Sequence, residues 1–182
     1  MDSNKQSTIK VNKLQGEYLA SNLNHVWTVD VTSIKQKYYF FFILDLASRR
    51  VVGYDVLNHD YTSTEATYVL YKALKEENSV IPHKSVKFVH TDSGGIFLSE
   101  EWKECLKRNE IKPSSADSKR NQNQVSERFN RTFKKLLRDY LNKKLNKKYN
   151  KTNIFQLIGK GTKYNFKNLI KITEEIIFYF FF

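Results

Sequence analysis

Cysteine is almost absent from this 182-residue chain, in which Cys105 is the single example. One cysteine excludes an internal disulfide framework and any zinc module built from several cysteines. Long apolar runs are also missing, because the terminal run IIFYFFF is far shorter than the roughly 20 residues that span a bilayer. The first residues, MDSNKQSTIKVNK, lack the apolar centre of a secretory signal. We therefore expect a cytoplasmic protein with no membrane partner.

Apolar residues are sufficient for a packed core, at 40% hydrophobic and 14% aromatic. This composition excludes a disordered or collagen-like chain, since such chains cannot bury enough apolar surface to offset the entropy lost on ordering. The length fits one domain rather than two. Within it we expect an N-terminal arm or linker over residues 1–23 and a globular unit over residues 24–182.

Excess positive charge is confined to the last third of the chain. The net charge is +12, yet residues 1–118 carry 15 basic and 15 acidic residues, whereas residues 119–182 carry 16 and 4. Clustered Lys and Arg suit a phosphate-backbone partner, because each neutralised phosphate releases counterions. The alternative is a solvated basic surface in a sequence rich in Lys, Asn, Ile, Phe and Tyr, as AT-rich coding would produce. Charge alone does not separate the two interpretations.

Hydrophobic periodicity predicts an α/β fold with a mixed sheet. Three β-rich runs in quick succession predict an antiparallel meander, and the middle run is apolar on both sides, as in a strand covered on both faces. We expect Ser63 and Thr64 to provide the N-cap of the first helix, and only a short helical turn, near residues 14–23, in the arm. In chain order the predicted elements are strands at 26–34, 37–46 and 49–57, a helix at 61–78, a strand at 86–92, a helix at 98–109, a strand at 111–115 and a helix at 124–141.

Three acidic residues occupy positions that a purely structural pattern rarely gives them. Asp30 interrupts an apolar-alternating strand, Asp92 ends an apolar strand just before Gly94, and Glu127 lies in the first turn of the basic helix. Each also has a structural interpretation, namely a cross-strand hydrogen bond, a turn cap and a favourable helix-dipole interaction. Three carboxylates at one sheet edge would repel one another unless a cation lay between them, and Mg²⁺ or Mn²⁺ prefers such oxygens. Two such ions could activate an attacking oxygen and stabilise the leaving oxygen of a phosphodiester.

The helix at 124–141 has two side-chain stripes. The apolar stripe is expected at Val125, Phe129, Phe133, Leu136 and Tyr140. A second stripe, at i, i+4, i+7 and i+11, consists of Glu127, Arg131, Lys134 and Arg138. The helix could thus deliver Glu127 to the metals while its next turns hold a phosphate backbone, although a solvated charged face would have the same pattern.

Four blocks of sequence resemble the catalytic core of integrase-type transposases of bacterial insertion sequences, which are relatives of retroviral integrase. The blocks are HVWTVDVTSI, FFILDLASRRVVGYDV, VKFVHTDSGGIF and NQNQVSERFNRTFKKLLRD, and they run in family order from about Asn24 to Tyr140. The resemblance implies an RNase H-like fold with a mixed five-stranded sheet, and a two-metal site of Mg²⁺ or Mn²⁺ on Asp30, Asp92 and Glu127. It also implies a mobile loop at 121–123. The residues expected to contact DNA are Lys119, Arg120, Arg131, Lys134, Lys135 and Arg138.

The function implied by this resemblance is DNA strand cleavage and strand transfer during integration and recombination. The enzyme would bind DNA element ends and target DNA as a homo-oligomer. Two departures from the family stand out: 34 residues rather than 35 separate Asp92 from Glu127, and the family's Tyr-Asn, Arg, His and Pro-bearing tail and its N-terminal recognition domain are missing. We therefore expect a core over residues 24–182 that is incomplete at its C-terminus. The alternatives are a catalytically inactive, truncated remnant that only binds DNA or dimerises, and a structure-selective nuclease of the same fold class.

Other candidate residues have mainly structural interpretations. His90 is two residues from Asp92 and could approach the metals, but a histidine on a buried strand more often has a structural role. Asp45 is expected to accept hydrogen bonds in a hairpin turn, and Trp27 to lie in the core. Cys105 falls on the apolar face of a helix, so we expect no nucleophilic role for it.

Overall fold

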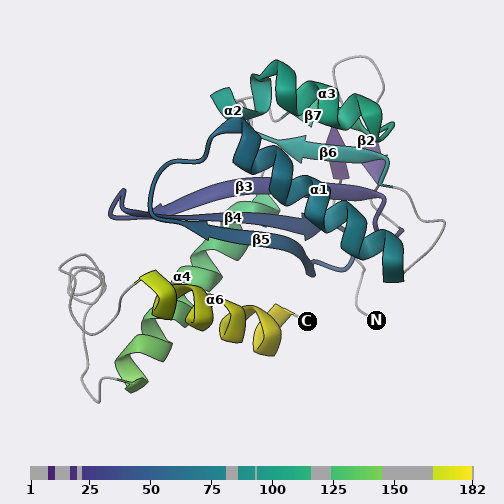
Figure 1. Cartoon of the computed structure of the whole chain (residues 1–182). Helices are drawn as coiled ribbons and strands as arrows, with labels where there is room; N and C mark the ends of the chain where they lie inside the picture. Colours follow the sequence, from purple (N-terminus) through teal and green to yellow (C-terminus); the bar gives the residue numbers. More distant parts are fainter. Residues whose placement is uncertain are drawn as a thin grey trace, which may run out of the picture.

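A central five-stranded sheet with helices on both faces organises the chain (Figure 1). The computed structural model describes residues 8–10, 17–19, 22–80, 86–92, 94–115, 124–144 and 166–181. The strands are β1 (Thr8–Lys10), β2 (Glu17–Leu19), β3 (Val26–Ile34), β4 (Tyr38–Asp45), β5 (Val51–Leu57), β6 (Phe88–Thr91) and β7 (Lys112–Ser115). The helices are α1 (Ser63–Val80), α2 (Gly95–Leu98), α3 (Glu100–Arg108), α4 (Gln124–Lys144) and α6 (Phe166–Phe181).

The strand order in the main sheet is β5-β4-β3-β6-β7. Strands β3, β4 and β5 form the predicted antiparallel meander, and β6 pairs with β3 in parallel, as β7 does with β6. The sequence-based prediction of a mixed five-stranded sheet is therefore confirmed. The parallel register places Thr28 of β3 beside His90 of β6, and His90 beside Ser114 of β7.

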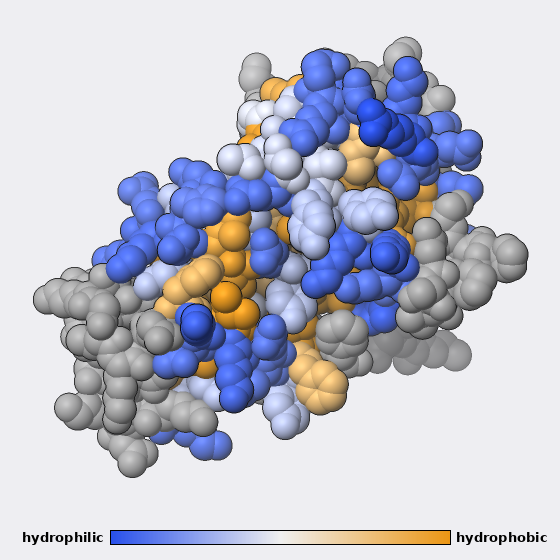
Figure 2. Space-filling view, in the orientation of Figure 1, coloured by the Kyte–Doolittle hydropathy of each residue, from blue (hydrophilic) through white to orange (hydrophobic). Residues whose placement is uncertain are grey.

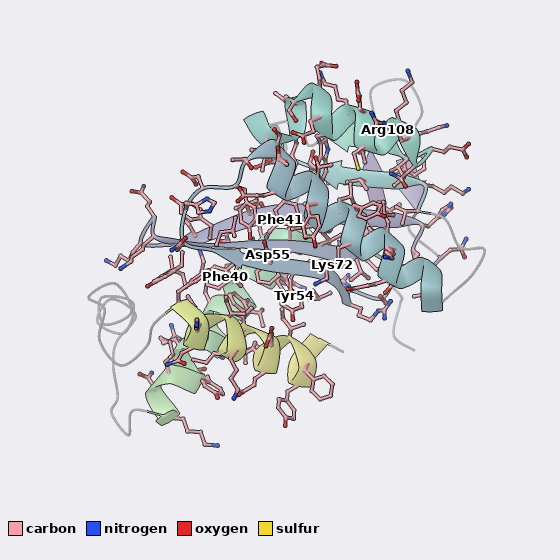
Figure 3. All side chains as sticks on the ribbon, viewed as in Figure 1. Phe40, Phe41, Tyr54, Asp55, Lys72 and Arg108 are labelled. Carbon is pink, nitrogen blue, oxygen red and sulfur yellow. The ribbon has the colours of Figure 1, made fainter. Side chains whose placement is uncertain are left out.

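Strand β4 separates two hydrophobic cores, because successive side chains of a strand point to opposite faces. Phe41 lies in the core beneath α1, α2 and α3, whereas Phe40 lies in the core beneath α4 and α6. Figure 3 shows these two neighbours on opposite sides of the sheet. Both rings are fully buried, as is Trp27. The expectation of a central strand covered on both faces is confirmed, and so is the core position of Trp27.

Helix α1 begins with a capping box at Thr62 and Glu65, one or two residues before the predicted N-cap. The Thr62 hydroxyl accepts a hydrogen bond from the Glu65 backbone N–H at 3.2 Å, and the Thr62 N–H donates to Glu65 Oε2 at 2.9 Å. Thr62 and Glu65 thus satisfy each other's backbone donors in the S/T-x-x-E pattern. The prediction that Ser63 and Thr64 cap the helix is wrong, because their hydroxyls donate to Glu101 of α3 instead.

Helices α4 and α6 cover the other face of the sheet, and α6 was not anticipated from the sequence. The buried stripe of α4 consists of Phe129, Phe133, Leu137 and Leu141. Leu136 and Tyr140, which were expected in this stripe, are only partly buried. The buried residues recur at every fourth position, so the stripe continues through Leu137 and Leu141 instead. Tyr140 instead donates a hydrogen bond to Glu175, which joins α4 to α6. Figure 2 shows hydrophobic residues at the surface between β5 and α6, where this core comes close to solvent.

One local prediction is wrong, and another is correct except at its start. Residues 17–19 form a strand paired with β1 rather than part of a helical turn. The helix predicted at 98–109 is α3, which begins at Glu100 because Ser99 is extended (ψ 151°) and its hydroxyl caps the helix by accepting from the Trp102 N–H. The separate short helix α2 precedes it. Residues 116–123, between β7 and α4, lie outside the described residues. No helix among the described residues is long and apolar enough to cross a membrane.

A buried polar network fixes the chain where β3 begins. Asn24, in a left-handed conformation (φ 58°), donates from its backbone N–H to Asp45 Oδ1 and from its side chain to Glu77 Oε2. Asp45 also accepts from the backbone N–H and the hydroxyl of Ser48. The expectation that Asp45 serves as a turn acceptor is confirmed.

Candidate active site

The sheet register and the α4 packing bring the three acidic residues to one edge of the sheet. Asp30 lies two residues beyond Thr28 on β3, and Asp92 lies two residues beyond His90, directly after β6. Because Thr28 and His90 are register partners, Asp30 and Asp92 reach the same level of two adjacent strands. Glu127 is in the first turn of α4, the helix that packs on β3.

Electrostatics show that these carboxylates lie close enough to influence one another. The pKa of Asp30 is raised to about 6, first by burial and then by the negative charge of Asp92. The Val31 N–H lowers it, Glu127 raises it further, and the Lys134 ammonium lowers it. Asp92 and Glu127 are themselves exposed. The sheet edge thus combines one half-buried carboxyl group with two solvent-facing ones.

Asn130 is a functional candidate that the sequence analysis missed. Its side-chain amide donates to Asp30 Oδ2 at 2.7 Å, while the Val31 N–H donates to Asp30 Oδ1 at 2.9 Å. Both carboxylate oxygens of Asp30 are therefore held, and its orientation is fixed by β3 and α4 together. The available signal was helical spacing, since Glu127, Asn130 and Lys134 at i, i+3 and i+7 share one face of α4.

Lys134 lies on the same face of α4 and is half-buried. Burial lowers the pKa of its ammonium group, whereas the charge of Asp30 raises it. A cation beside the acidic group reduces the repulsion among the carboxylates. It also places a positive charge where a phosphate would approach them.

The backbone after β6 shapes the position of Asp92. The Gly94 N–H donates to Asp92 Oδ1 at 3.0 Å. A Cβ atom at position 94 would lie 2.9 Å from the same oxygen, whereas a Cβ at Gly95 would have no neighbour within 4 Å. Glycine at 94 is therefore required for the observed orientation of the Asp92 carboxylate.

The donor chemistry fits a divalent metal ion, although a complete ligand set is not assembled in this conformation. Among the described residues, no group of three His, Cys, Asp or Glu side chains is already arranged to hold a metal. However, Asp92 and Glu127 both destabilise the charged form of Asp30, and a divalent cation would reverse that repulsion. Because the two outer carboxylates are exposed, they can turn toward a cation without disturbing the core.

The expected DNA-contacting residues are only partly placed. Arg131 and Lys135 are exposed on α4, and the side chain of Arg138 is 20% exposed with its Nε 3.4 Å from Asp139 Oδ1. Lys119 and Arg120 lie outside the described residues, as does the expected loop at 121–123. The exposed cations therefore flank Lys134 on the helix that carries Glu127.

The remaining candidates have structural environments. His90 is fully buried, and burial lowers its pKa to about 4. Its Nδ1 pairs with the Ser114 hydroxyl at 2.9 Å, while its Nε2 has no partner among the described residues. Cys105 is partly buried, and burial raises the pKa of its thiol, which disfavours the nucleophilic thiolate.

Comparison with known proteins gives matches in sequence and in structure. The family model described as "Integrase core domain" matches residues 20–120, a range that contains Asp30 and Asp92 but ends before Glu127. Transposase InsF for insertion sequence IS3A of Escherichia coli (strain K12) is 30% identical over 112 residues, which are 58% of this chain and 36% of the transposase. The chain therefore spans only about a third of the length of the curated relatives that it matches.

Two solved structures have a similar fold. One is a chain of the simian T-cell lymphotropic virus intasome in complex with PP2A regulatory subunit B56 gamma, with a TM-score of 0.59 and 19% identity over 90% of this chain and 57% of that one. The other is the HTLV-2 integrase catalytic core domain in complex with magnesium (dimeric form), with a TM-score of 0.51 and 27% identity over 77% of this chain and 89% of that one. The first likeness concerns the fold alone. Together they confirm the expected RNase H-like architecture.

Proposed function

We propose, from the premise that this chain belongs to the integrase core domain family, that it cleaves DNA strands and joins their ends during integration and recombination. The observation that carries the proposal is the convergence on Asp30, whose pKa is raised by both Asp92 and Glu127. Carboxylates spread for solubility over a surface would not be brought to the same level of two adjacent parallel strands, as Asp30 and Asp92 are. The similar proteins include a transposase and an integrase core, and both names point to the same reaction class.

In this proposal, Asp30, Asp92 and Glu127 hold Mg²⁺ or Mn²⁺ in a two-metal site. The bound ions supply activation of the attacking oxygen and stabilisation of the leaving oxygen of a phosphodiester. The similar HTLV-2 core was solved in complex with magnesium, which supports this choice of ion. The attacking oxygen would come first from water and then from a DNA 3′-hydroxyl, so the enzyme forms no covalent intermediate.

The protein's own residues orient the reactants. Asn130 and the Val31 N–H keep Asp30 in one orientation. The Gly94 N–H donates to Asp92 Oδ1, and the exposed Asp92 carboxylate can still turn toward a cation. Preorganised ligands of this kind lower the cost of reaching the reactive geometry. Lys134 would neutralise the scissile phosphate.

Contacts to the DNA backbone would come from cations around this site. The exposed side chains of Arg131 and Lys135 lie on α4 beside Lys134. Further contacts are proposed for Arg138, Lys119 and Arg120. Such contacts to phosphates give affinity and orientation rather than sequence specificity.

The assembly we propose is a homo-oligomer, with residues 24–182 as the core and residues 1–23 as an arm. The similar HTLV-2 cores were solved in dimeric and trimeric forms. Two DNA ends and a target need at least two active sites, which an oligomer of one chain provides.

Metal-dependent nicking of supercoiled plasmid DNA tests the proposed function. We expect nicking by the wild-type protein in Mn²⁺ or Mg²⁺ and none in EDTA, with a loss of at least about 100-fold in Asp92→Asn and Glu127→Gln. Asp60→Asn is the matched control, because Asp60 is an exposed acid outside the site, and it should nick as the wild type does. Wild-type nicking by Asp92→Asn would refute the site assignment. DNA retention without nicking in any variant would favour the inactive DNA-binding alternative.

A further inference from the structure

A buried polar layer lies one pleat below the proposed carboxylates, and this inference rests on the proposed function. The layer consists of Thr28, His90, Ser114 and Ser126, each no more than 2% exposed. Thr28, His90 and Ser114 are register partners across β3, β6 and β7. Ser126 reaches this row from α4, where its hydroxyl and that of Thr28 share a hydrogen bond of 2.8 Å.

Two members of this layer are close to the proposed carboxylates in the sequence. Thr28 precedes Asp30 by two residues, and Ser126 immediately precedes Glu127. Side chains two residues apart on a strand share a face, about 7 Å apart. The hydroxyl pair therefore joins the strand that carries the first carboxylate to the helix that carries the third, close to both.

The Thr28–Ser126 hydroxyl pair is polar, whereas the contact between α4 and the sheet around it is apolar. Around it, α4 packs through Phe129 and Phe133 against Phe42 and its neighbours, with ring centroids 4.8 and 4.9 Å apart. Apolar packing is non-directional and tolerates small sliding and rotation. A hydrogen bond between two buried hydroxyls has a narrow range of distance and angle, and each hydroxyl is costly to bury if the bond is broken.

We propose that Thr28 and Ser126 are positioning residues, whose hydroxyl–hydroxyl bond sets the rotation and height of α4 so that Glu127 meets the same metal ions as Asp30. The alternative role is stability alone, in which the bond holds α4 to β3 but a shift of Glu127 has no consequence. The two roles differ in one measurable respect. Positioning requires that the affinity of the folded protein for metal depends on the bond, whereas a purely stabilising bond changes only unfolding.

The test is Mn²⁺ titration by calorimetry together with thermal unfolding in EDTA. The variants are Thr28→Val, Ser126→Ala and the double variant, with Thr28→Ser retaining the hydroxyl. We expect Mn²⁺ to bind about 10- to 100-fold more weakly to both single variants and to the double variant, as for other residues that orient metal ligands. Thr28→Ser should bind as the wild type does.

Thermal unfolding distinguishes the stability that the hydrogen bond contributes from the cost of burying a hydroxyl that has lost this partner. Each single variant leaves one hydroxyl without this partner and should unfold at a lower temperature, whereas the double variant removes both hydroxyls and should recover part of the loss. Thr173→Val is the matched control, because Thr173 is also fully buried but its hydroxyl donates to Leu169 within α6, away from the site. It should leave Mn²⁺ affinity unchanged.

The outcomes distinguish this inference from the function on which it rests. Wild-type Mn²⁺ affinity in folded Thr28→Val and in the double variant, with loss of binding in Asp92→Asn, would overturn the positioning role alone. Equal Mn²⁺ binding by Asp92→Asn and wild type would refute the proposed metal site, and the positioning role with it. Should Thr28→Val fail to fold, Ser126→Ala and the double variant decide the question.

Discussion

At the scale of single residues, Asp30 is held by hydrogen bonds, yet its negative charge destabilises the folded protein. Its two oxygens accept hydrogen bonds from Val31 and Asn130, yet burial and two neighbouring carboxylates raise its pKa from 3.8 to about 6. The folded protein therefore binds this proton more tightly than the unfolded chain does. The raised pKa corresponds to roughly 3 kcal/mol of lost stability once the group is ionised.

The first prediction concerns the pH dependence of stability in EDTA. Between about pH 4 and pH 6 the folded state holds more protons than the unfolded state, so stability should fall as pH rises through that window. Asp30→Asn should abolish this part of the slope and be more stable than wild type at pH 7, by up to about 3 kcal/mol. Asn130 can turn its amide to accept from the new side chain, since its Oδ1 has no partner among the described residues. Urea unfolding at several pH values measures this, and a variant less stable than wild type at pH 7 would contradict it.

The second prediction uses the adjacent glycines after β6. Gly94→Ala would place a Cβ 2.9 Å from Asp92 Oδ1 and push the carboxylate aside, whereas Gly95→Ala meets nothing within 4 Å. We expect Gly94→Ala to weaken Mn²⁺ binding and nicking about 10-fold or more, with little change in unfolding temperature, because a flexible side chain can move away. Gly95→Ala should be as active as wild type. Equal activity in the two variants would show that the orientation of Asp92 is unimportant.

The sequence predicted the proposed carboxylates but not the residues that orient them. Asp30 follows from its interruption of an apolar-alternating strand, Asp92 from its position at a strand end, and Glu127 from the first turn of the basic helix. The resemblance of the four blocks points to the same three residues. Asn130 was missed because helical spacing places it on the Glu127 face of α4 but does not show that Asp30 of β3 lies beneath that face. Thr28 and Ser126 were missed for the same reason, since their partnership spans 98 residues of sequence.

At the scale of elements, helix α1 depends on one buried acid for its position over the sheet. Glu77 accepts from the Asn24 side chain at 2.8 Å and from Arg50 Nη2 at 2.6 Å. These bonds tie the last turns of α1 to the start of β3 and to the approach to β5. Gly53 adds close packing, because a Cβ there would lie 2.8 Å from the Cβ of Ala73.

The third prediction compares neighbouring glutamates on α1. Glu77→Ala should lower the free energy of unfolding by about 2–3 kcal/mol, since it leaves the buried Asn24 amide without this acceptor. Glu76→Ala should lower the free energy of unfolding by less than about 1 kcal/mol. The Glu76 side chain is 61% exposed, and its ion pair with Lys72 is long, at 3.9 Å. Urea unfolding of both variants is the measurement. Similar losses would mean that the network around Asn24 does not anchor α1.

Element prediction succeeded where burial gives a strong period and failed where tertiary contacts decide. Strands β3, β4 and β5 and helix α1 lie close to their predicted ranges because their apolar residues alternate or recur at helical spacing. The strand at Glu17–Leu19 has only three residues, too few for a period, and exists through its pairing with β1. The α4 stripe was shifted by one residue because Leu136 and Leu137 are both leucines, and only packing against α6 and the sheet selects between them.

At the scale of the whole molecule, the first part of the chain has no net charge and the last part is basic. Residues 1–118 are balanced, and the excess of 12 positive charges falls in residues 119–182. In the described structure, α4 brings part of this charge to the same edge of the sheet as the acidic residues. The arrangement suits a polyanion whose backbone must be held close to a carboxylate site.

The fourth prediction concerns the salt dependence of DNA binding. In the double variant Arg131→Gln/Lys135→Gln, the slope of log K against log[salt] should become less steep by about 2, because two phosphate contacts are removed. Lys72→Gln/Lys75→Gln removes two exposed charges from α1 on the other face of the sheet and should leave the slope unchanged. Fluorescence anisotropy with a labelled duplex at several salt concentrations measures both. Equal slopes for the two double variants would place the DNA elsewhere.

The central claim is that Asp30, Asp92 and Glu127 form one metal site, and Mn²⁺ titration of the wild type beside Asp30→Asn, Asp92→Asn and Glu127→Gln tests it most directly. We expect saturable Mn²⁺ binding by the wild type and a large loss of affinity in each of the three variants, with all four proteins folded. Undiminished binding in any one variant would remove that residue from the site. Undiminished binding in all three would contradict the account.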